Sequence, residues 1–338
     1  MKTALYASAA VIALAAFGAA PAFAQSRDTI QIAGSSTVLP FASIVAEEFG
    51  AAFPEFKTPV VGSGGTGGGL KQFCEGVGDN TIDIANASRA IKDSEREACT
   101  AAGVTDIREI QFGYDGIVFA SAASGPDFAL TPLQVYKAIA AKVPVDGALV
   151  DNPYKKWSDI DPSLPDQDIS LAIPGTNHGT REVFQLEVID AGAEEAGLPE
   201  GLTEEEHTAA LTTFRQDVVV EISGDYTETL ARLTSNPNTV GVFGLSFYDQ
   251  NKDTLKVATV NGVVPSNESV AAGEYPVSRP LFFYVKGQHI GIIPGIEEYV
   301  QFFLSEAAAG GSLEAAGLIP QPEEKTAEVL AAFEAGAQ

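Results

Sequence analysis

From Asp28 onward the chain alternates short β-rich runs with amphipathic helical runs, and this alternation restricts its fold more than any other feature. Such alternation is typical of α/β proteins, in which helices cover largely parallel sheets. The first three predicted strands cover residues 29–33, 58–62 and 82–87, and a helical run follows each of them. At 338 residues with 45% hydrophobic residues, the composition excludes disorder and predicts one large or two ordinary α/β domains.

The charge balance limits the partners of this chain. Its 45 aspartates and glutamates outnumber its 20 lysines and arginines, which gives a formal net charge of −25. Because phosphate-backbone binding needs clustered positive charge, we expect no nucleic-acid partner, and anionic membrane surfaces are disfavoured for the same reason.

Residues 1–24 have the features of a secretory signal peptide. Lys2 precedes an apolar run, and Ala22-Phe23-Ala24 has the small-x-small pattern of a cleavage site. The alternative is an uncleaved anchor, but the apolar run is shorter than the ~20 residues that a spanning helix needs. We therefore expect cleavage after Ala24 and an exported, periplasmic protein.

The two cysteines, Cys74 and Cys99, are expected to form a disulfide, because thiols tend to oxidise in exported proteins. The alternative is a metal ligand or a catalytic thiol. The three histidines are scattered, however, and none has ligand spacing with either cysteine. We expect no metal and no cofactor.

Three turns rich in Gly, Ser and Thr each lie between a predicted strand and a predicted helix, at residues 34–37, 62–67 and 176–180. A helix N-terminus exposes unpaired N–H groups and a positive dipole, and the hydroxyls add donors, so each turn could hold an anion. Any one turn is more simply an ordinary helix cap, but three in one chain favour a shared anionic ligand.

The second turn also fits a dinucleotide-binding motif, because Gly62, Gly64 and Gly67 have the G-x-G-x-x-G spacing and Asp83 follows at a suitable distance. The export signal and the extra hydroxyls and glycines of this turn argue against that interpretation. Arg89 follows the third strand, where α/β folds place ligands, and its guanidinium suits an oxyanion. The alternative for Arg89 is a surface ion pair, and we expect Arg181 at the surface.

Eight stretches make the chain similar to the phosphate-binding proteins of phosphate ABC transporters, a type II periplasmic-binding-protein family. They run in order over about residues 30–322 and read IAGSSTVLP, GSGGTGGG, IANASRAI, LTPLQVYKAI, GTNHGT, VGVFGLSFY, YPVSRPLFF and GLIPQP. The resemblance implies two α/β lobes, each a mixed sheet flanked by helices, with phosphate in the interlobe cleft. We expect lobe 1 at 25–112 plus 284–338, lobe 2 at 118–277, and interlobe crossings at 113–117 and 278–283.

The resemblance also implies a set of phosphate ligands. Transferred residue by residue, they are Ser36, Thr37, Ser63, Gly64, Ser88, Gly179 and Thr180. Ser88 and Pro174 stand where the best-known branch has an Asp and an Arg, and His178 stands where the family often has Ser. The chain resembles the branch with a Ser-Arg pair after the third strand, in which Arg89 would supply the positive charge.

Selection of phosphate over sulfate needs a buried hydrogen-bond acceptor, because phosphate at neutral pH still carries a proton and sulfate does not. Ser88 discriminates poorly, since a hydroxyl both donates and accepts. We expect Asp115, on the first crossing, to be this acceptor in preference to Asp83, which starts its strand. The alternative is that Asp115 only caps the hinge turn.

The expected function is high-affinity binding of inorganic phosphate outside the cytoplasm and its delivery to the transmembrane permease subunits of an ABC transporter. We expect a monomer that is not an enzyme. One alternative is a receptor for another tetrahedral oxyanion. The other is a secreted phosphatase, which has little support because the sequence has no G-x-S-x-G motif, no metal-ligand cluster and no histidine spaced to activate a serine.

Overall fold

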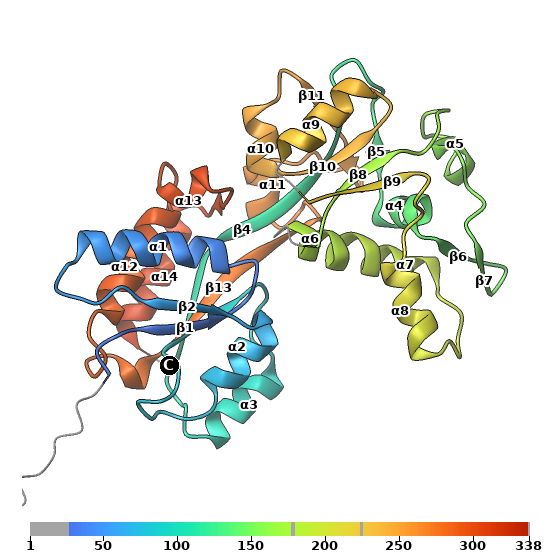
Figure 1. Ribbon diagram of the computed structural model, residues 1–338. Coiled ribbons are helices and arrows are strands. Elements are labelled where there is room, and N and C mark those ends of the chain that lie inside the picture. Colours follow the sequence, from blue (N-terminus) through green and yellow to red (C-terminus); the bar gives the residue numbers. More distant parts are fainter. Residues whose placement is uncertain (1–26, 177–179, 224–225, 337–338) are drawn as a thin grey trace, which may run out of the picture.

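The computed structural model describes residues 27–176, 180–223 and 226–336. The expected cleavage site at Ala24 lies outside the described residues. The described chain forms two α/β lobes, and two long strands, β4 (Ile107–Ala122) and β13 (Ser278–Lys286), run from one lobe into the other (Figure 1). None of the helices in this part of the chain combines the length and the hydropathy of a membrane span.

The first lobe is built around three short parallel strands near the N-terminus (Figure 1). The strands are β1 (Gln31–Gly34), β2 (Val60–Ser63) and β3 (Ile84–Ala87). Its helices are α1 (Leu39–Ala52), α2 (Gly65–Phe73), α3 (Asp93–Ala101), α12 (Ile296–Ala307), α13 (Ser312–Ala315) and α14 (Glu323–Ala335), with the 3-10 turn η2 (Gly287–His289). The C-terminal segment thus returns to the lobe in which the described chain begins.

The second lobe takes the middle of the chain. Its main strands are β8 (Leu171–Pro174), β9 (Val219–Ile222), β10 (Val240–Gly244) and β11 (Leu255–Val257). Two small sheets are formed by β5 (Ala129–Leu130) with β12 (Thr259–Val260) and by β6 (Lys142–Val145) with β7 (Ala148–Asp151). The helices are α4 (Pro132–Ile139), α5 (Trp157–Ile160), α6 (Thr180–Val183), the π-helix η1 (Phe184–Asp190), α7 (Ala191–Ala196), α8 (Glu204–Thr212), α9 (Tyr226–Ser235), α10 (Leu245–Gln250) and α11 (Asn267–Ala271).

One sheet connects the two lobes, with the strand order β2-β1-β3-β13-β4-β10-β8-β9. Strand β4 pairs antiparallel with β13 along most of its length and with β10 at its far end. Strands β11 and β14 (Ile319–Pro320) also pair with β4. Because β4 and β13 are hydrogen-bonded to each other where the lobes meet, residues on both strands are fixed at the junction.

Separate hydrophobic cores fill the two lobes. Buried residues between 117 and 277, together with Ile319, form one core. Buried residues from 30 to 112 and from 281 to 333 form the core between the first sheet and helices α1 and α12. Strand β4 contributes Phe112 to the second of these cores and Phe119 to the first, so a single strand is buried in both lobes.

The predicted alternation of strands and helices is confirmed, and three local details differ. Helix α2 begins at Gly65, within the glycine-rich stretch that was expected to be a turn at residues 62–67. Strand β4 is continuous through residues 113–117, because β13 and β10 supply its hydrogen-bond partners. The hairpin of β6 and β7 was not predicted, although its strands are largely apolar and the Asp146-Gly147 turn between them, with positive φ at both residues, is typical of a β-hairpin.

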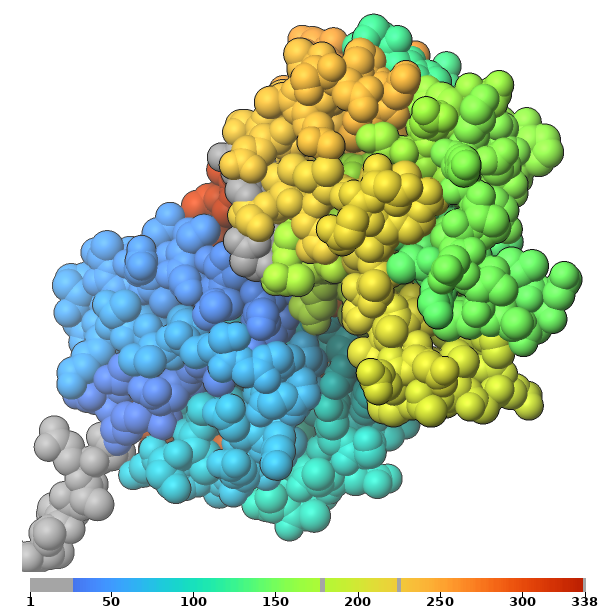
Figure 2. All heavy atoms as spheres, turned by 45° about the vertical axis from the view of Figure 1, so that its right-hand side comes forward, coloured from blue at the N-terminus to red at the C-terminus, as the bar shows by residue number. Residues whose placement is uncertain are grey.

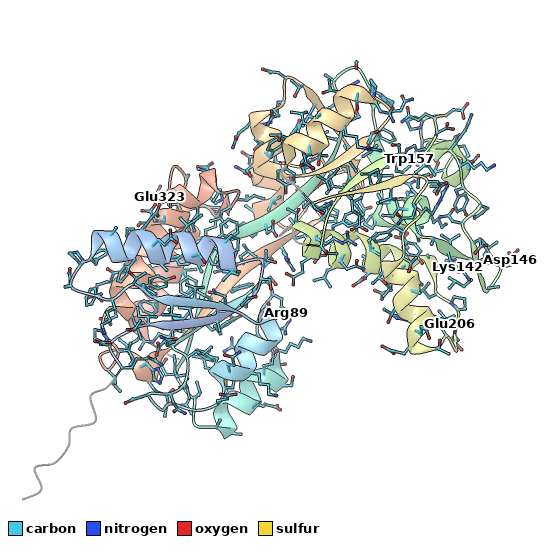
Figure 3. The ribbon with its side chains drawn as sticks, viewed as in Figure 1. Arg89, Lys142, Asp146, Trp157, Glu206 and Glu323 are labelled. Carbon is cyan, nitrogen blue, oxygen red and sulfur yellow. A yellow bond between two sulfur atoms is a disulfide. The ribbon has the colours of Figure 1, made fainter. Side chains whose placement is uncertain are left out.

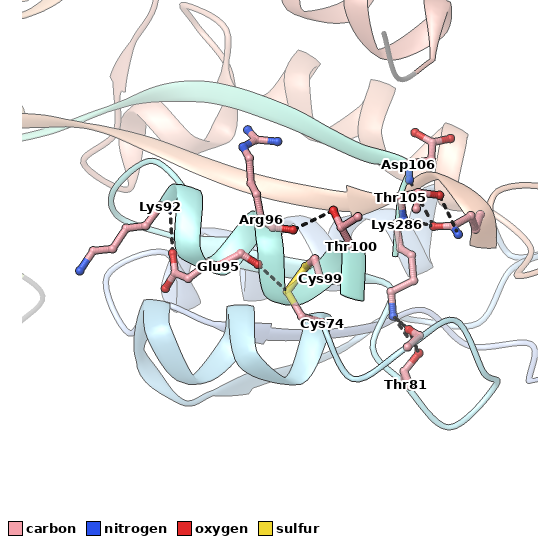
Figure 4. The surroundings of a disulfide bond; sticks show 12 residues. Cys74, Thr81, Lys92, Glu95, Arg96, Cys99, Thr100, Thr105, Asp106 and Lys286 are labelled. Carbon is pink, nitrogen blue, oxygen red and sulfur yellow. Dashed lines mark hydrogen bonds between the residues drawn. A yellow bond between two sulfur atoms is a disulfide. The ribbon is translucent and has the colours of Figure 1, made fainter. Parts of the chain in front are cut away.

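The expected disulfide is confirmed: Cys74 and Cys99 are joined, with their Cα atoms 4.2 Å apart (Figure 4). The bond connects the residue that follows α2 to the buried side of α3. Both cysteines belong to a third cluster of buried residues that includes Phe73 and Tyr284. The disulfide therefore fixes the two helices of the first lobe that flank β3.

We expect the Cys74→Ala/Cys99→Ala double variant to be destabilised by ~3 kcal/mol, because the cross-link restricts the unfolded chain. Circular dichroism melts with and without a reductant measure the effect. The wild type should lose stability in reductant, and the double variant should be insensitive to it. Equal melting temperatures for the oxidised wild type and the double variant would contradict the prediction.

Candidate functional site

The carboxyl ends of β1, β2 and β3 meet at one edge of the sheet. Gly34 at the end of β1 pairs with Ser63 on one side and with Asn86 on the other. Since all three strands are parallel, the residues that follow them are brought together at this edge. Two of the three predicted anion-binding turns and Ser88 therefore converge, as the sequence analysis expected.

Two glycines allow this close approach. Gly34 has a φ of +144°, and a β-carbon there would collide with the backbone of Asn86. A β-carbon at Gly69 would collide with Gly34, so α2 packs directly on β1 only because both positions lack side chains. This packing places the first turn of α2 against the end of β3.

Hydroxyl groups line the edge. The Oγ atoms of Ser36 and Ser63 lie 3.1 Å apart. The hydroxyl of Thr66 lies 3.1 Å from that of Ser88 and accepts a hydrogen bond from the Ser88 amide at 3.0 Å. Thr66 was missed as a member of this cluster, although it belongs to the glycine-rich turn singled out in the sequence.

Arg279 on β13 is the buried cation at the junction of the lobes, with 6% of the residue exposed. Its Nη2 donates to the hydroxyl of Thr37 at 2.8 Å. Asp115 lies opposite Arg279 in the antiparallel register, and the Asp115 Oδ2 is 3.9 Å from Nη2. The sequence predicts a crossing at residues 278–283, but it does not indicate a role for the arginine. The available signal was a charged residue directly before the apolar run at residues 280–285.

Glu182 reaches this cluster from α6 in the second lobe. One carboxylate oxygen accepts from the hydroxyl of Thr37 and lies 3.3 Å from the Arg279 Nη2, and the other accepts from Ser88 at 3.4 Å. Burial of Glu182 acts to raise its pKa, but the hydrogen bond from Thr37 and the charge of Arg279 outweigh this and lower the pKa. The ionised carboxylate of Glu182 is thus bound by hydroxyl donors from the first lobe and by the guanidinium on the crossing strand β13. This residue was also missed in the sequence.

The helix that carries Glu182 is irregular. Four α-helical residues of α6 lead directly into the seven-residue π-helix η1 and then into α7. Segments of π-helix are rare in proteins, but those that occur are often found at functional sites. The π-helix also places Leu186 and Glu187 on the cleft, beside Arg279.

Asp115 is a buried carboxylate with unused hydrogen-bonding capacity, and 8% of the residue is exposed. Its Oδ2 accepts no hydrogen bond from any described residue. Burial raises the pKa of Asp115 to about 6, although the nearby Arg279 acts to lower it. At neutral pH the side chain is therefore mostly ionised, and its free oxygen can accept a hydrogen bond from a protonated ligand.

Arg89 lies on the side of the first lobe that faces the second lobe (Figure 3). Both of its terminal nitrogens donate to Glu95, each at 2.9 Å, and 36% of its side chain is exposed. Its role as a ligand stays a prediction. Arg181, expected at the surface, has only 12% of its side chain exposed, because it pairs with Glu221 at 3.1 Å and lies over Phe214.

Other predicted site residues have different positions. Gly179 and His178 lie outside the described residues. Gly64 directly precedes α2, and the hydroxyl of Thr180 accepts from Tyr226 at 3.2 Å. Asp83 lies at the opposite end of β3, where it pairs with Arg27 and His289, so it cannot act as the ribose ligand of a dinucleotide site at this edge.

Three cavities are bordered by Thr37, by Glu182 or by both residues. The largest, about 750 Å³, is bordered by both residues. A second of about 410 Å³ is bordered by Ser88, Arg89, Glu182 and Arg279, and a third of about 170 Å³ by Thr37 and Asp115. Figure 2 shows the surface hollowed between the lobe drawn in blue and the segment drawn in yellow. The donors described above therefore line the interlobe cleft.

The arrangement is suited to binding an oxyanion. Its polar groups are hydroxyls, one buried guanidinium and carboxylates. Within the described residues, no group of three or more His, Cys, Asp or Glu side chains is placed to hold a metal ion. Hydrogen bonds from hydroxyls and a guanidinium are typical of sites that hold a tetrahedral anion.

Comparison with known proteins agrees with this architecture. A family model described as a PBP superfamily domain matches residues 19–307. The protein SphX of Synechococcus elongatus is 31% identical over 319 residues, covering 93% of this chain and 83% of SphX. The phosphate-binding protein PstS of Staphylococcus epidermidis is 29% identical over 297 residues, or 86% of this chain and 78% of that protein.

A solved structure described as a possible phosphate-binding protein from Planctomyces limnophilus superposes with a TM-score of 0.69 at 27% identity, covering 91% of this chain and 98% of the other. The structure of PstS from Borrelia burgdorferi has a TM-score of 0.61 at 18% identity, with 88% and 100% coverage, and supports the fold alone. With a family model that matches most of its length and a relative above 30% identity, this two-lobed α/β chain belongs to the PBP superfamily, with a type II periplasmic-binding-protein fold.

Proposed function

We propose that this protein binds inorganic phosphate in the interlobe cleft and delivers it to the permease of an ABC transporter. The observation that carries the proposal is the position of the Glu182 carboxylate. Two hydroxyls and a buried guanidinium, from Thr37, Ser88 and Arg279, already converge on its two oxygens. Donors that hold a carboxylate in this way also fit the oxygens of phosphate.

The relatives support phosphate as the ligand. PstS of Staphylococcus epidermidis is named a phosphate-binding protein, and it matches most of this chain. The Planctomyces limnophilus structure carries a similar description at 27% identity. Both names describe binding of phosphate and no catalysis. Binding alone also fits an interlobe cleft that is lined by hydrogen-bond donors.

Delivery to a permease requires the protein to be exported. We propose that residues 1–24 direct export and are removed after Ala24, which leaves a monomeric periplasmic receptor. The lobes are proposed to span 25–112 plus 284–338 and 118–277, with residues 113–117 and 278–283 as the crossings. The separate hydrophobic cores and the continuous strands β4 and β13 support this division.

Isothermal titration of the purified protein with phosphate, sulfate and molybdate tests the proposal. We expect one phosphate site for each chain and much weaker binding of the other two anions. Strong binding of sulfate or molybdate with none of phosphate would identify a receptor for another oxyanion. The absence of heat with all three would exclude the proposed function.

We expect Arg279→Met to weaken phosphate binding by about thirtyfold or more, since loss of a buried, hydrogen-bonded charge costs ~2 kcal/mol or more. Arg181→Met is the matched control, because Arg181 pairs with Glu221 instead of the hydroxyl cluster. It should change the affinity by less than about threefold. Melting curves establish that both variants fold, and equal losses in the two variants would contradict the assignment.

Asp115→Asn should reduce the preference for phosphate over sulfate, chiefly through lower phosphate affinity. The ionised carboxylate accepts a hydrogen bond from the protonated oxygen of phosphate, whereas it repels an unprotonated sulfate oxygen. Competition binding at pH 7.5, well above the pKa of about 6, measures the ratio while Asp115 is charged. An unchanged ratio would remove Asp115 from the ligand set and leave it as a hinge residue.

A further inference from the structure

Glu182 occupies the donors that the proposed function assigns to phosphate. We propose that Glu182 is an internal competitor: its carboxylate holds these donors when no ligand is bound, and phosphate must displace it. The inference rests on the proposed function and describes how the same site is regulated. Three observations support the inference: the hydrogen bonds of Glu182, the charges near it and the free space around its side chain.

Hydrogen-bond stoichiometry makes the two anions mutually exclusive. A hydroxyl has one proton to donate. The Thr37 hydroxyl accepts from Arg279 and gives its proton to Glu182, so it has none left for a phosphate oxygen. The Ser88 hydroxyl likewise donates to the second oxygen of Glu182. Phosphate can use these hydroxyl protons only after the carboxylate has left.

The local charges also oppose simultaneous binding of phosphate and the Glu182 carboxylate. Arg279 is the cation in contact with this cluster, and it already faces the carboxylates of Asp115 and Glu182. Adding a phosphate dianion with Glu182 in place would put three anionic groups around one guanidinium. In a partly buried site this repulsion is far stronger than in water. Because its contacts lower the pKa of Glu182, the side chain is charged and is expelled as an anion.

The structure leaves room for this displacement. About 41% of the Glu182 side chain is exposed, in contrast to the 6% of Arg279. The side chain borders both the 750 Å³ and the 410 Å³ cavities, so a rotation about its own bonds can move the carboxylate into solvent. The backbone of α6 need not unfold.

The competition has a measurable consequence for affinity. A ligand that binds only the fraction of molecules with a free site has an apparent dissociation constant raised by the inverse of that fraction. The contact also connects α6 of the second lobe to the donors of the first lobe. Glu182 therefore lowers phosphate affinity and holds the two lobes in contact across the ligand-free cleft.

The test compares Glu182→Gln with Glu187→Gln by calorimetric titration of the full exported protein with inorganic phosphate. We expect Glu182→Gln to bind phosphate about tenfold more tightly than the wild type, since a neutral amide holds the donors less strongly than a carboxylate. Glu187 borders the same 410 Å³ cavity from the next turn of the helix, so its variant removes an equal charge and should change affinity by less than about threefold.

A second variant, Glu182→Ala, removes the side chain entirely and should shift the affinity in the same direction. Phosphate binding to the wild type separates the two hypotheses: if the wild type binds no phosphate, the proposed function itself fails. If the wild type binds and both Glu182 variants bind equally or more weakly, the competitor role is overturned. Equal gains in the Glu182 and Glu187 variants would also overturn it, because they would show an effect of charge alone.

Discussion

The central constraint in this molecule is the burial of the Arg279 guanidinium where the two lobes meet. A buried charge is strongly unfavourable unless hydrogen bonds and opposite charges compensate it. The compensating groups come from three places: Thr37 from the first lobe, Asp115 from the paired crossing strand and Glu182 from the second lobe. The arginine therefore connects both lobes to the crossing strands, and the site exists only while the lobes are correctly placed.

The sheet provides that placement. The antiparallel register of β13 and β4 puts Arg279 opposite Asp115, and the parallel register of β1 with β2 and β3 brings Ser63 and Ser88 to the same edge. Gly34 and Gly69 add the close packing of α2 on β1. The disulfide behind this edge holds α2 against α3. Ser63 is thus positioned by strand pairing itself, and Ser88 directly follows the last residue of β3.

Local patterns in the sequence predicted the turns, the α/β alternation and the pairing of Cys74 with Cys99, because each depends on neighbouring residues or on composition. Arg279 and Glu182 could not be assigned in the same way. They lie far apart in sequence, and their contact depends on strand register and on the irregular helix that includes η1. Arg89 carried the stronger local signal because it follows the third strand, yet Glu95, six residues further along the chain, holds both of its terminal nitrogens.

The formal charge of −25 is compatible with anion capture because the distant carboxylates act weakly on the cleft. At physiological ionic strength, exposed charges farther away than about 8 Å are largely screened, whereas the guanidinium and the hydroxyls act at contact distance. The decisive negative charges are then the few inside the cleft, above all Asp115 and Glu182. Asp115 has a buried oxygen without a hydrogen-bond partner among the described residues, and Glu182 holds the donors that the proposed function assigns to phosphate. A transport receptor must release its ligand as well as bind it, and a carboxylate that can return to the same donors favours release.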